Sequence, residues 1–469
     1  MKNNYSISLF LFFLVLTSSL NGQLFAAEYY VSASAAANGD GSETRPFNTL
    51  FQAQSLSAAN DTIYLLANAQ AKILDGGIAL KSGQKLLGIS NNGQLLTDAD
   101  RRVRMTNTTS HQNGVIVLLS DHNEVAGIHF MDMRAYAISA ADTNYSGTYI
   151  HHALFTGNAD QHIEDERGLV YAISLDANEG DQRGIIIEDS AFYNGEDLGA
   201  IRVFHSGDSR GNYLFQRNDF SDLGGRPYFV RTQHRSRVET IILDSSADNI
   251  GLGDRNSDSI IPYLMGQSEQ VMLVRNYHYK NTKQVGNQSS TGIEAFLFGY
   301  PRPDEANWCT ACKLTFKIVD SVIENAITDS IQFSNSGRNS QLTYEISNTR
   351  IIGGTPQQGG GGISLNLQSV ADSGSRTTLL VENTEVIGTT GYGFAMNNRG
   401  GGDGHTVIVD FGGGALGSVG NNRIIDNERG DMRLSQERIT AKNNEWDGIA
   451  PRIFNSDDEL FPDANIDTD

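Results

Sequence analysis

The sequence predicts an all-β protein, a single-stranded right-handed parallel β-helix with a capping helix at its N-terminal end. Short β-rich segments run through most of its 469 residues, with little helical periodicity, 49 glycines and only 8 prolines. One type of segment recurs about every 30 residues, which is typical of one solenoid coil with its loops. Because few tight hairpin turns separate the segments, whole coils repeat, and a β-sandwich is disfavoured.

A second β-rich segment comes shortly before most copies of the recurring one. Examples of this second segment are "GIIIEDSAFYN" and "QVMLVRNYHYKN". The copies of the first segment are "AYAISAAD" (135–142), "LVYAISLD" (169–176), "GAIRVFHS" (199–206), "RPYFVRTQ" (226–233), "SIIPYLMG" (259–266), "GIEAFLFG" (292–299), "DSIQFSNS" (329–336), "GGISLNLQ" (361–368) and "GYGFAMNN" (391–398). This repetition predicts one stack of coils over residues 28–454.

The first residues have the pattern of a secretory signal peptide, predicted over residues 1–27. Lys2 supplies positive charge, residues 9–16 are all apolar, and Ala26 and Ala27 offer the small residues of a cleavage site. The apolar run is too short for a membrane span, and no second long apolar segment follows. We therefore expect an exported protein, secreted or periplasmic, without a membrane span.

The start of the mature chain, about residues 28–66, is expected to cap the stack. "YYVSA" and "DTIYLL" are typical of strands, and a helix-like stretch lies between them with one apolar face formed by Leu50, Phe51, Ala53 and Leu56. An uncovered end strand would expose unpaired backbone groups and the core. This arrangement resembles the start of right-handed parallel β-helix proteins of the pectate-lyase-like superfamily, in which the helix plugs the open end. Residues 455–469 are acidic and aperiodic, and are expected to form a poorly ordered tail.

The only two cysteines, Cys309 and Cys312, predict a small disulfide, as is usual in an exported protein. A zinc site would need two further ligands, and no second CxxC or nearby histidine pair supplies them. A thioredoxin-like role would need a βαβ context that the pattern does not have. The sequence indicates no cofactor, and whether a metal binds is unknown. Calcium binding by carboxylates from separate loops remains an alternative.

Alternation along the recurring segment predicts an outward row of polar side chains. Equivalent positions of successive coils stack about 4.8 Å apart. If Ile173, Ile201 and Val203 point inward, the outward row consists of Asp176, Arg202, Arg231, Glu294, Gln332, Asn366 and Asn397. Such a mixture of arginine, acid and amide side chains suits a long polar glycan. A plain solvated face is the alternative, and a register error of one residue would invert the list.

Basic residues gather in two successive coils of a chain whose net charge is −20. They are Arg202, His205, Arg210, Arg217, Arg226, Arg231, His234, Arg235 and Arg237. The acidic balance of the whole chain argues against nucleic acid as a partner. Concentrated positive charge repels itself unless an anion occupies the site, and arginine suits carboxylate and sulfate. The alternative is local pairing with acids, namely Asp208, Asp219, Asp222 and Glu239.

These residues favour a polysaccharide lyase that cleaves an acidic, uronate-containing polysaccharide by β-elimination. The reaction needs a cation at the uronate carboxylate, a base for the C5 proton and an acid at the leaving oxygen. Arg231 and Arg202 are expected at the carboxylate, and His205 is expected to be the base. Arg231, His234 or Tyr228 would serve the leaving group, although the register favours a core position for Tyr228. Other substrate-binding candidates are Arg210, Asp176, Glu294, Gln332 and Asn366.

The passage "IRVFHSGDSRGNYLFQRNDFSDLGGRPYFVRTQH", residues 201–234, is similar to the active-site part of the chondroitinase B and alginate lyase family. On that resemblance, His205 falls where the family has a basic lysine, and Arg231 falls on its arginine. The family's calcium-binding acids have no counterpart, because Leu198 and Ala200 stand in their place. The resemblance implies a lyase with His205 and Arg231 as catalytic residues.

Two other classes of function stay open, and the oligomeric state is not indicated. A glycoside hydrolase needs two carboxyl groups about 5–10 Å apart. Asp176 and Glu294 are expected to lie about four coils apart, and Asp254 and Asp258 are equally typical of turns. A non-catalytic glycan-binding or adhesin-type protein would use the same arginines and amides without turnover, since the fold alone does not imply catalysis.

Overall fold

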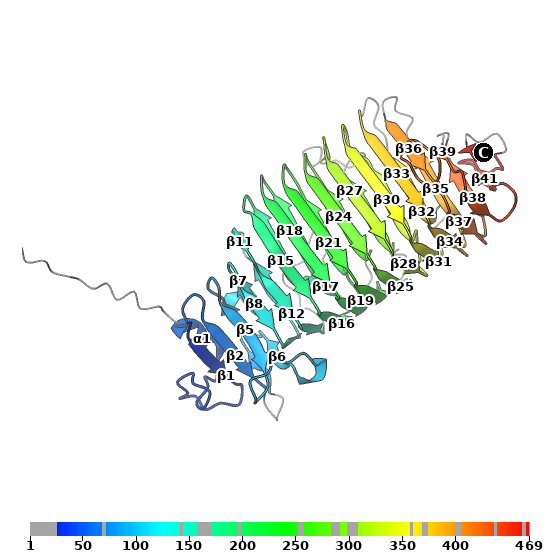
Figure 1. Cartoon of the computed structure of the whole chain (residues 1–469). Helices are drawn as coiled ribbons and strands as arrows, with labels where there is room; N and C mark the ends of the chain where they lie inside the picture. The colour runs from blue at the N-terminus through cyan, green and yellow to red at the C-terminus, as the bar shows by residue number, and fades with distance from the viewer. Residues whose placement is uncertain are drawn as a thin grey trace, which may run out of the picture.

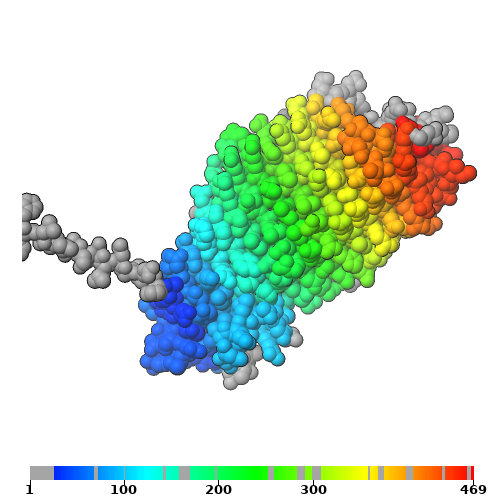
Figure 2. Space-filling model, in the orientation of Figure 1, coloured from blue at the N-terminus to red at the C-terminus, as the bar shows by residue number. Residues whose placement is uncertain are grey.

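The computed structural model describes residues 26–67, 72–140, 144–157, 170–195, 198–251, 258–282, 291–297, 308–356, 360–367, 374–398, 405–435, 439–461 and 466–468. These residues wind into an elongated stack of coils, with the two chain ends at opposite tips (Figure 1). In the same view, the coils form one continuous body along the whole length (Figure 2). Most of the predicted signal peptide, residues 1–25, lies outside the described residues.

Three parallel sheets run along the stack, and strand pairing joins each coil to the next within every sheet. Sheet 1, whose strands cross the front of Figure 1, has 16 strands. They are β1 (Glu28–Val31), β2 (Thr62–Leu66), β5 (Lys85–Ile89), β8 (Glu124–Ala126), β11 (Tyr145–Ser146), β12 (Tyr149–His151), β15 (Gln182–Glu188), β18 (Arg210–Gln216), β21 (Arg237–Leu243), β24 (Glu269–Arg275), β27 (Lys313–Val319), β30 (Gln341–Ser347), β33 (Arg376–Glu382), β36 (Thr406–Asp410), β39 (Ile439–Thr440) and β42 (Ile466–Asp467).

Sheet 2 and sheet 3 have 13 strands each. Those of sheet 2 are β4 (Ile78–Ala79), β7 (Val117–Leu119), β10 (Ile138–Ala140), β14 (Val170–Asn178), β17 (Leu198–Ser206), β20 (Tyr228–Thr232), β23 (Ile260–Leu264), β26 (Ile293–Leu297), β29 (Ile331–Asn335), β32 (Gly361–Leu367), β35 (Tyr392–Asn398), β38 (Gly430–Leu434) and β41 (Ile453–Phe454). Those of sheet 3 are β3 (Leu74–Asp75), β6 (Val103–Thr106), β9 (Ile128–Met131), β13 (Leu154–Thr156), β16 (Ala191–Gly195), β19 (Asp219–Leu223), β22 (Ser246–Ile250), β25 (His278–Thr282), β28 (Val322–Glu324), β31 (Arg350–Ile352), β34 (Glu385–Ile387), β37 (Arg423–Ile425) and β40 (Glu445–Trp446).

The nine recurring segments of the sequence form consecutive strands of one sheet. They supply β10, β14, β17, β20, β23, β26, β29, β32 and β35 of sheet 2. Each coil visits the sheets in a fixed order, as in β15 of sheet 1, β16 of sheet 3 and β17 of sheet 2. The predicted fold class, a parallel β-helix with one N-terminal helix, is confirmed.

The interior is filled by side chains that stack on those of the next coil. Phe130, Phe155, Phe192 and Phe220 form one column on β9, β13, β16 and β19, and all four are fully buried. Their ring centroids lie 5.0, 4.5 and 5.0 Å apart in that order, and the ring planes are close to parallel. Burial of large aromatic rings contributes heavily to the stability of such a core.

On ten successive coils from β12 onward, the corner between sheet 1 and sheet 3 is made by one non-glycine residue in the left-handed conformation. The residues at this corner are His152, Asp189, Arg217, Asp244, Asn276, Asp320, Asn348, Asn383, Asn421 and Asn443, all with φ between 49° and 60°. Asparagine and aspartate tolerate this conformation better than most residues, because their short side chains form local hydrogen bonds. The sharp turn therefore explains why eight of these ten corner residues are Asn or Asp.

The only α-helix among the described residues, α1 (Leu50–Leu56), covers the first strand of sheet 2. Its Leu50 and Ala53 face the core. Gln54 Oε1 accepts a hydrogen bond of 2.7 Å from the backbone N–H of Ala79 in β4, and Lys81 Nζ donates to the Gln54 carbonyl at 3.0 Å. The helix thus satisfies part of an edge that would otherwise be left unpaired. Two short 3₁₀ turns, Ala99–Arg101 and His111–Gly114, complete the helical elements.

Described residues of the acidic C-terminal segment, 455–461 and 466–468, contact earlier coils. Within it, β42 pairs in parallel with β39, as Ile466 aligns with Ile439. Asp458 forms ion pairs with Arg433 at 3.0 Å and with Arg429 at 3.4 Å. Acidic residues that look aperiodic in sequence therefore hold the last coils together.

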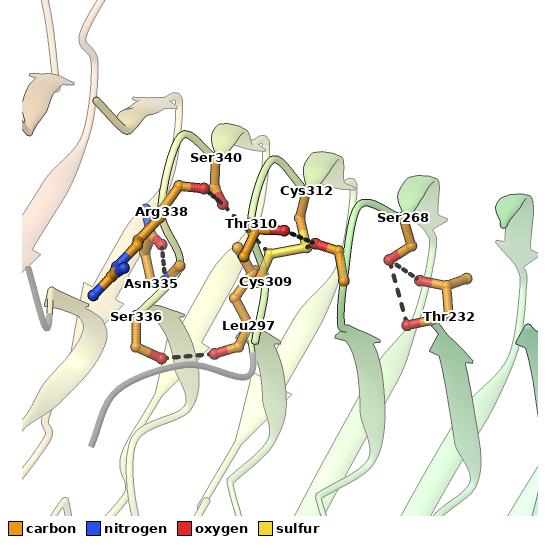
Figure 3. Close-up of a disulfide and its surroundings, with 12 residues drawn as sticks. Thr232, Ser268, Leu297, Cys309, Thr310, Cys312, Asn335, Ser336, Arg338 and Ser340 are labelled. Atoms are coloured by element: carbon orange, nitrogen blue, oxygen red, sulfur yellow. Dashed lines mark hydrogen bonds between the residues drawn. A yellow bond between two sulfur atoms is a disulfide. The ribbon is translucent and has the colours of Figure 1, made fainter. Parts of the chain in front are cut away.

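Cys309 and Cys312 form the predicted disulfide in the turn before β27. Both are fully buried, and the carbonyl of Cys309 accepts a 2.8 Å hydrogen bond from the backbone N–H of Arg338 on the next coil. Figure 3 shows the disulfide between the turns of neighbouring coils. The disulfide thus fixes a turn that packs against both adjacent coils.

Within the described residues, every helix is too short or too polar to cross a lipid bilayer.

We expect Phe192→Ala to destabilise the protein by about 3–5 kcal/mol, because it removes one ring from the middle of the phenylalanine column. Phe51→Ala is the matched control, since this phenylalanine of α1 is 62% exposed. The control should change the free energy of unfolding by less than about 0.5 kcal/mol. Guanidinium denaturation followed by circular dichroism measures both, and equal losses would contradict the assignment of the core.

Candidate functional site

The outward face of sheet 2 carries two parallel columns of side chains, where a single row was expected. In one column, Asp176 aligns with Phe204, Arg231 and Tyr263 on successive strands. In the other, Ser174 aligns with Arg202, Phe229 and Ile261. The expected row placed Asp176 and Arg202 at the same level, but they lie two positions apart along the strand. The predicted row was wrong here because a single sequence does not determine the pairing register of two strands to the exact residue.

Arg202 and Arg231 converge on one aromatic ring. The guanidinium carbon of Arg202 lies 5.3 Å, and that of Arg231 5.1 Å, from the centroid of Phe204. Arg202 also forms an ion pair of 3.2 Å with Asp176 and donates to Ser174 Oγ at 3.1 Å. Arg231 donates from Nη2 to Gln233 Oε1 at 3.3 Å. Stacking on an aromatic ring holds a guanidinium in place. The two adjacent coils thus present two fixed cations on the outer face.

Aromatic side chains continue this face across the next coils. Phe229 stacks against Tyr171 with centroids 6.0 Å apart, and Tyr263 stacks against Phe296 at 5.2 Å. Arg231 lies 5.7 Å from the Tyr263 ring. These rings form an apolar cluster separate from the interior core. The sequence did not predict these outward rings. Phe204, two residues after Arg202 on the same strand, nevertheless has to face the same side as Arg202.

The C-terminal half of the same face is lined by amides. Gln332 Nε2 donates to Glu294 Oε1 at 2.8 Å, and Asn397 Nδ2 donates to Asn366 Oδ1 at 2.9 Å. Arg433 in turn donates to the Asn397 side-chain oxygen. Glu294 and Gln332 are aligned in one column of this face, whereas Asn366 is aligned with Ser334 in the other column.

His205 lies inside the solenoid, which contradicts its expected role as the base. Its side chain has no exposed area. Nδ1 is 3.0 Å from Ser209 Oγ, and Nε2 is 2.6 Å from the Tyr213 hydroxyl. Because Tyr213 donates to Gln182, His205 Nε2 must carry the proton and Nδ1 must accept from Ser209. Burial lowers the pKa of His205 to about 3, so this histidine is a neutral core residue.

The remaining predicted site residues lie away from Arg231. Tyr228 is fully buried between the rings of Phe215 and Phe220, so the structure corrects its assignment to the substrate. His234 is exposed in the left-handed corner between sheet 2 and sheet 1. Arg210 begins β18 on sheet 1, in a shallow pocket of about 300 Å³ with Arg183, Arg237 and Glu239.

Several arginines of the basic cluster are paired with acids, but among the described residues only Asp208, of the four acids expected to pair with them, does so. Arg235 pairs with Asp208 at 2.6 Å and Arg237 approaches Glu269 at 3.7 Å. Arg217 pairs with Glu188 and Asp189, each at 2.7 Å.

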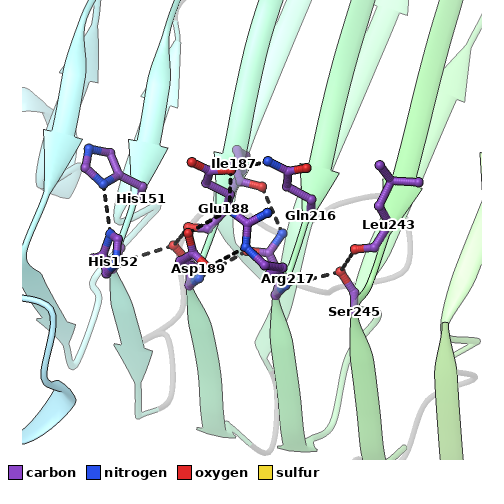
Figure 4. A network of polar contacts seen from close by, with 12 residues as sticks. His151, His152, Ile187, Glu188, Asp189, Gln216, Arg217, Leu243 and Ser245 are labelled. Carbon is purple, nitrogen blue, oxygen red and sulfur yellow. Dashed lines mark hydrogen bonds and ion pairs between the residues drawn. The ribbon is translucent and has the colours of Figure 1, made fainter. Parts of the chain in front are cut away.

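The Arg217 pairs belong to a network of polar side chains at the corner of sheets 1 and 3 (Figure 4). The hydrogen bond from Arg217 lowers the pKa of Asp189. On the same edge, His151 lies 3.2 Å from Glu124, and the hydrogen bond from His151 lowers the pKa of Glu124 to about 2. This network was not predicted, because its members come from separate coils and become neighbours only after the coils stack.

Asp176 and Glu294 do not come together as the pair that a glycosidase needs. Asp176 on β14 and Glu294 on β26 are four strand spacings apart, roughly 19 Å. Asp258 is buried and accepts a hydrogen bond from the Thr291 N–H at 2.8 Å, and Asp254 lies outside the described residues. Asp329, whose pKa burial raises to about 6, is enclosed and accepts from Ser364 at 2.7 Å.

Among the described residues, no three His, Cys, Asp or Glu side chains are gathered as metal ligands would be.

A family model described as "Protein of unknown function (DUF1565)" matches residues 269–453. None of the curated proteins matches the sequence. Among solved structures, a GH136 lacto-N-biosidase from Eubacterium ramulus has a TM-score of 0.49 at 9% identity, covering 82% of this chain and 67% of that chain. XylC in complex with xylose has a TM-score of 0.39 at 8% identity and covers 91% and 87%.

A mannuronic acid specific polysaccharide family 6 lyase from human gut microbiota has a TM-score of 0.27 at 11% identity, with 90% and 81% of the two chains covered. At such identities, the site has to be argued from its own residues.

The buried His205 predicts a pH dependence of stability. Its folded-state pKa of about 3 lies below the value near 6.5 of an unfolded chain, so the unfolded state binds the extra proton between these values. Stability should be fully present above about pH 6.5 and fall as the pH drops toward 3, by up to about 1.4 kcal/mol per pH unit. Urea denaturation from pH 7.5 to 4.5 should show a steeper loss for the natural protein than for His205→Gln. Identical slopes would mean that His205 is not buried in its neutral form.

Proposed function

We propose that the protein is an exported carbohydrate-active enzyme that cleaves an acidic polysaccharide by β-elimination on the outer face of sheet 2. The observation that carries the proposal is the pair of guanidinium groups, from Arg202 and Arg231, held over Phe204 on adjacent coils. Two cations held over one ring by adjacent coils suit a carboxylate-bearing sugar unit. Arg231 has the central role, since its guanidinium lies beside both Phe204 and the Tyr263 ring of the next coil.

The chemistry requires that the uronate carboxylate be neutralised before the C5 proton can leave. Arg231 is assigned this step, because electrostatic stabilisation of the developing enolate-like charge is a large term in such reactions. The C5–H and C4–O bonds then break, a C4=C5 double bond forms, and the leaving oxygen takes up a proton. No redox partner or cofactor is needed for this balance.

Tyr263 is assigned the proton transfer that the sequence had given to His205. It aligns with Arg231 on the next coil, the guanidinium carbon lies 5.7 Å from its ring centroid, and the residue is 6% exposed, whereas His205 and Tyr228 have no exposed area. A nearby cation stabilises the negative charge that proton transfer would leave on a phenol oxygen. A phenol can remove the C5 proton and return one to the leaving oxygen.

The rest of the face supports binding of an extended chain. The half-buried rings of Phe204 and Phe296 offer apolar surfaces to sugar rings, and the amides of Gln332, Asn366 and Asn397 offer donors and acceptors to hydroxyl groups. These groups are spread over successive strands of sheet 2, so the substrate would run along the solenoid axis. The disulfide and the signal-peptide pattern of residues 1–27 support export.

A non-catalytic glycan-binding protein is the second candidate. It is favoured by the burial of His205, which leaves the described outer face of sheet 2 without a histidine base. The same arginines and rings would then retain an acidic glycan without turnover.

Arg231→Gln should lower kcat/KM on an acidic polysaccharide by at least about 100-fold, because the carboxylate loses its cation. Alginate, pectate and glycosaminoglycans serve as substrates, and unsaturated products are followed by ultraviolet absorbance. Arg235→Gln is the matched control, since Arg235 pairs with Asp208 in the exposed turn and should leave activity unchanged. New reducing ends without unsaturation would refute β-elimination. A fully active Arg231→Gln variant would place the site elsewhere.

Tyr263→Phe should lower kcat by at least about 100-fold, because the hydroxyl that transfers the proton is lost. KM and glycan affinity should change by only a few-fold. Kinetics on the preferred glycan together with affinity electrophoresis separate the two effects. Equal loss of binding and turnover would assign Tyr263 to packing. Glycan binding without turnover in the natural protein would favour the second candidate.

A further inference from the structure

A groove of about 740 Å³ lies at the corner of sheets 1 and 3, over the last coils of the solenoid. Six of its ten lining residues are asparagines, and the others are two arginines and two glutamates. The lining residues are Asn348, Arg350, Asn383, Glu385, Asn421, Asn422, Arg423, Asn443, Asn444 and Glu445. None of them belongs to sheet 2, so this groove is separate from the arginine site.

The asparagines form a ladder along the groove. Asn348, Asn383, Asn421 and Asn443 occupy the left-handed corner on four successive coils, and all four are exposed. Backbone hydrogen bonds link the rungs, such as Asn421 N–H to the Asn443 carbonyl at 2.8 Å. The amide groups therefore repeat at about the coil spacing of 4.8 Å.

The corner conformation does not by itself require an amide at every rung. Earlier coils place Asp189, Arg217, Asp244 and Asp320 at the same corner, with φ between 49° and 52°. From Asn348 onward, within the described coils, the corner is always asparagine. The ladder is visible in the sequence as "SNTRI", "ENTEV", "NNRII" and "NNEW", in which an asparagine is followed two residues later by Arg or Glu.

The charges in the groove neutralise one another. Arg350, Glu385, Arg423 and Glu445 are aligned on β31, β34, β37 and β40, so positive and negative side chains alternate. Arg350 pairs with Glu385 at 2.8 Å, and Arg423 pairs with Glu445 at 3.2 Å. An anionic chain would meet two carboxylates here, so the groove disfavours the ligand expected on sheet 2.

The amides keep hydrogen-bonding capacity toward the groove. Asn421 Nδ2 donates to Asn383 at 3.3 Å and Asn348 Nδ2 donates to Asp320 at 3.2 Å. In the described part of the chain, the Oδ1 atoms of Asn348, Asn421 and Asn443 accept no hydrogen bond from protein. Each amide combines a donor and an acceptor, which matches hydroxyl groups that also do both.

We propose that this groove is a second, non-catalytic binding site for an uncharged, hydroxyl-rich polysaccharide that runs along the asparagine ladder. Periodic amides suit a polymer of repeated hydroxyl-bearing units, and the balanced charges disfavour an anion. Such a site would hold the protein on neutral glycans while the sheet 2 face meets an acidic one. The proposal does not depend on catalysis.

Affinity gel electrophoresis tests the proposal with soluble galactomannan and mixed-linkage β-glucan as neutral probes and polygalacturonate as the acidic probe. The natural protein should be retarded by at least one neutral probe. Asn383→Gly together with Asn421→Gly should weaken that retardation about tenfold, because two amides are lost. Glycine accepts the left-handed corner, so the fold should persist.

Asn276→Gly is the matched control, because Asn276 occupies the same corner outside the groove with φ of 53°. It should keep full neutral-glycan binding, and its melting temperature should equal that of the double variant. If the double variant fails to fold, Asn421→Asp replaces it, since aspartate already occupies this corner on other coils. Arg231→Gln should retain the binding, which separates this proposal from the proposed catalytic function. Absent retardation by both neutral probes, or unchanged retardation of the groove variants, would overturn the proposal.

Discussion

Parallel, in-register pairing of successive coils is the constraint on which the rest of this structure depends. Every strand of a sheet takes its position from the strand before it, so a side chain is placed by its level on the coil rather than by its neighbours in sequence. The Phe192 column in the interior and the Arg231 column outside follow from the same pairing. At each end of such a stack, the last strand exposes unpaired backbone groups and the core. At the N-terminal end, α1 covers this edge.

The same constraint explains how much of the site could be predicted. The repeat fixed which segments would stack, and alternation placed Arg202 and Arg231 on the outer surface, where the structure has them. Alternation also implied the burial of His205, since it shares its parity with Ile201 and Val203. The expectation that His205 is the base, drawn from its chemistry and from the family resemblance, conflicts with that rule, and the structure follows the rule.

Other features could not be read from one sequence, for physical reasons. The offset between Asp176 and Arg202 depends on register, which hydrophobic alternation fixes only to within two residues. The pairing of Arg217 with Glu188 joins residues whose closeness depends on the length of the intervening coil. The role of Asp458 is similar, because an acidic residue looks like part of a solvated tail until the arginines of earlier coils are placed.

The uneven spacing of paired residues has a consequence for how such a chain can change over time. Arg202 and Phe229 are aligned across 27 positions, whereas Glu294 and Gln332 are aligned across 38. The strand pairing of sheet 2 is continuous at both places, so the segments between strands can lengthen without disturbing the pairing around them. Insertions and deletions at these places are therefore nearly neutral for folding. The loops beside a binding face can change during evolution while the strands beneath them keep their register. Proteins with this one fold can therefore evolve to bind different ligands.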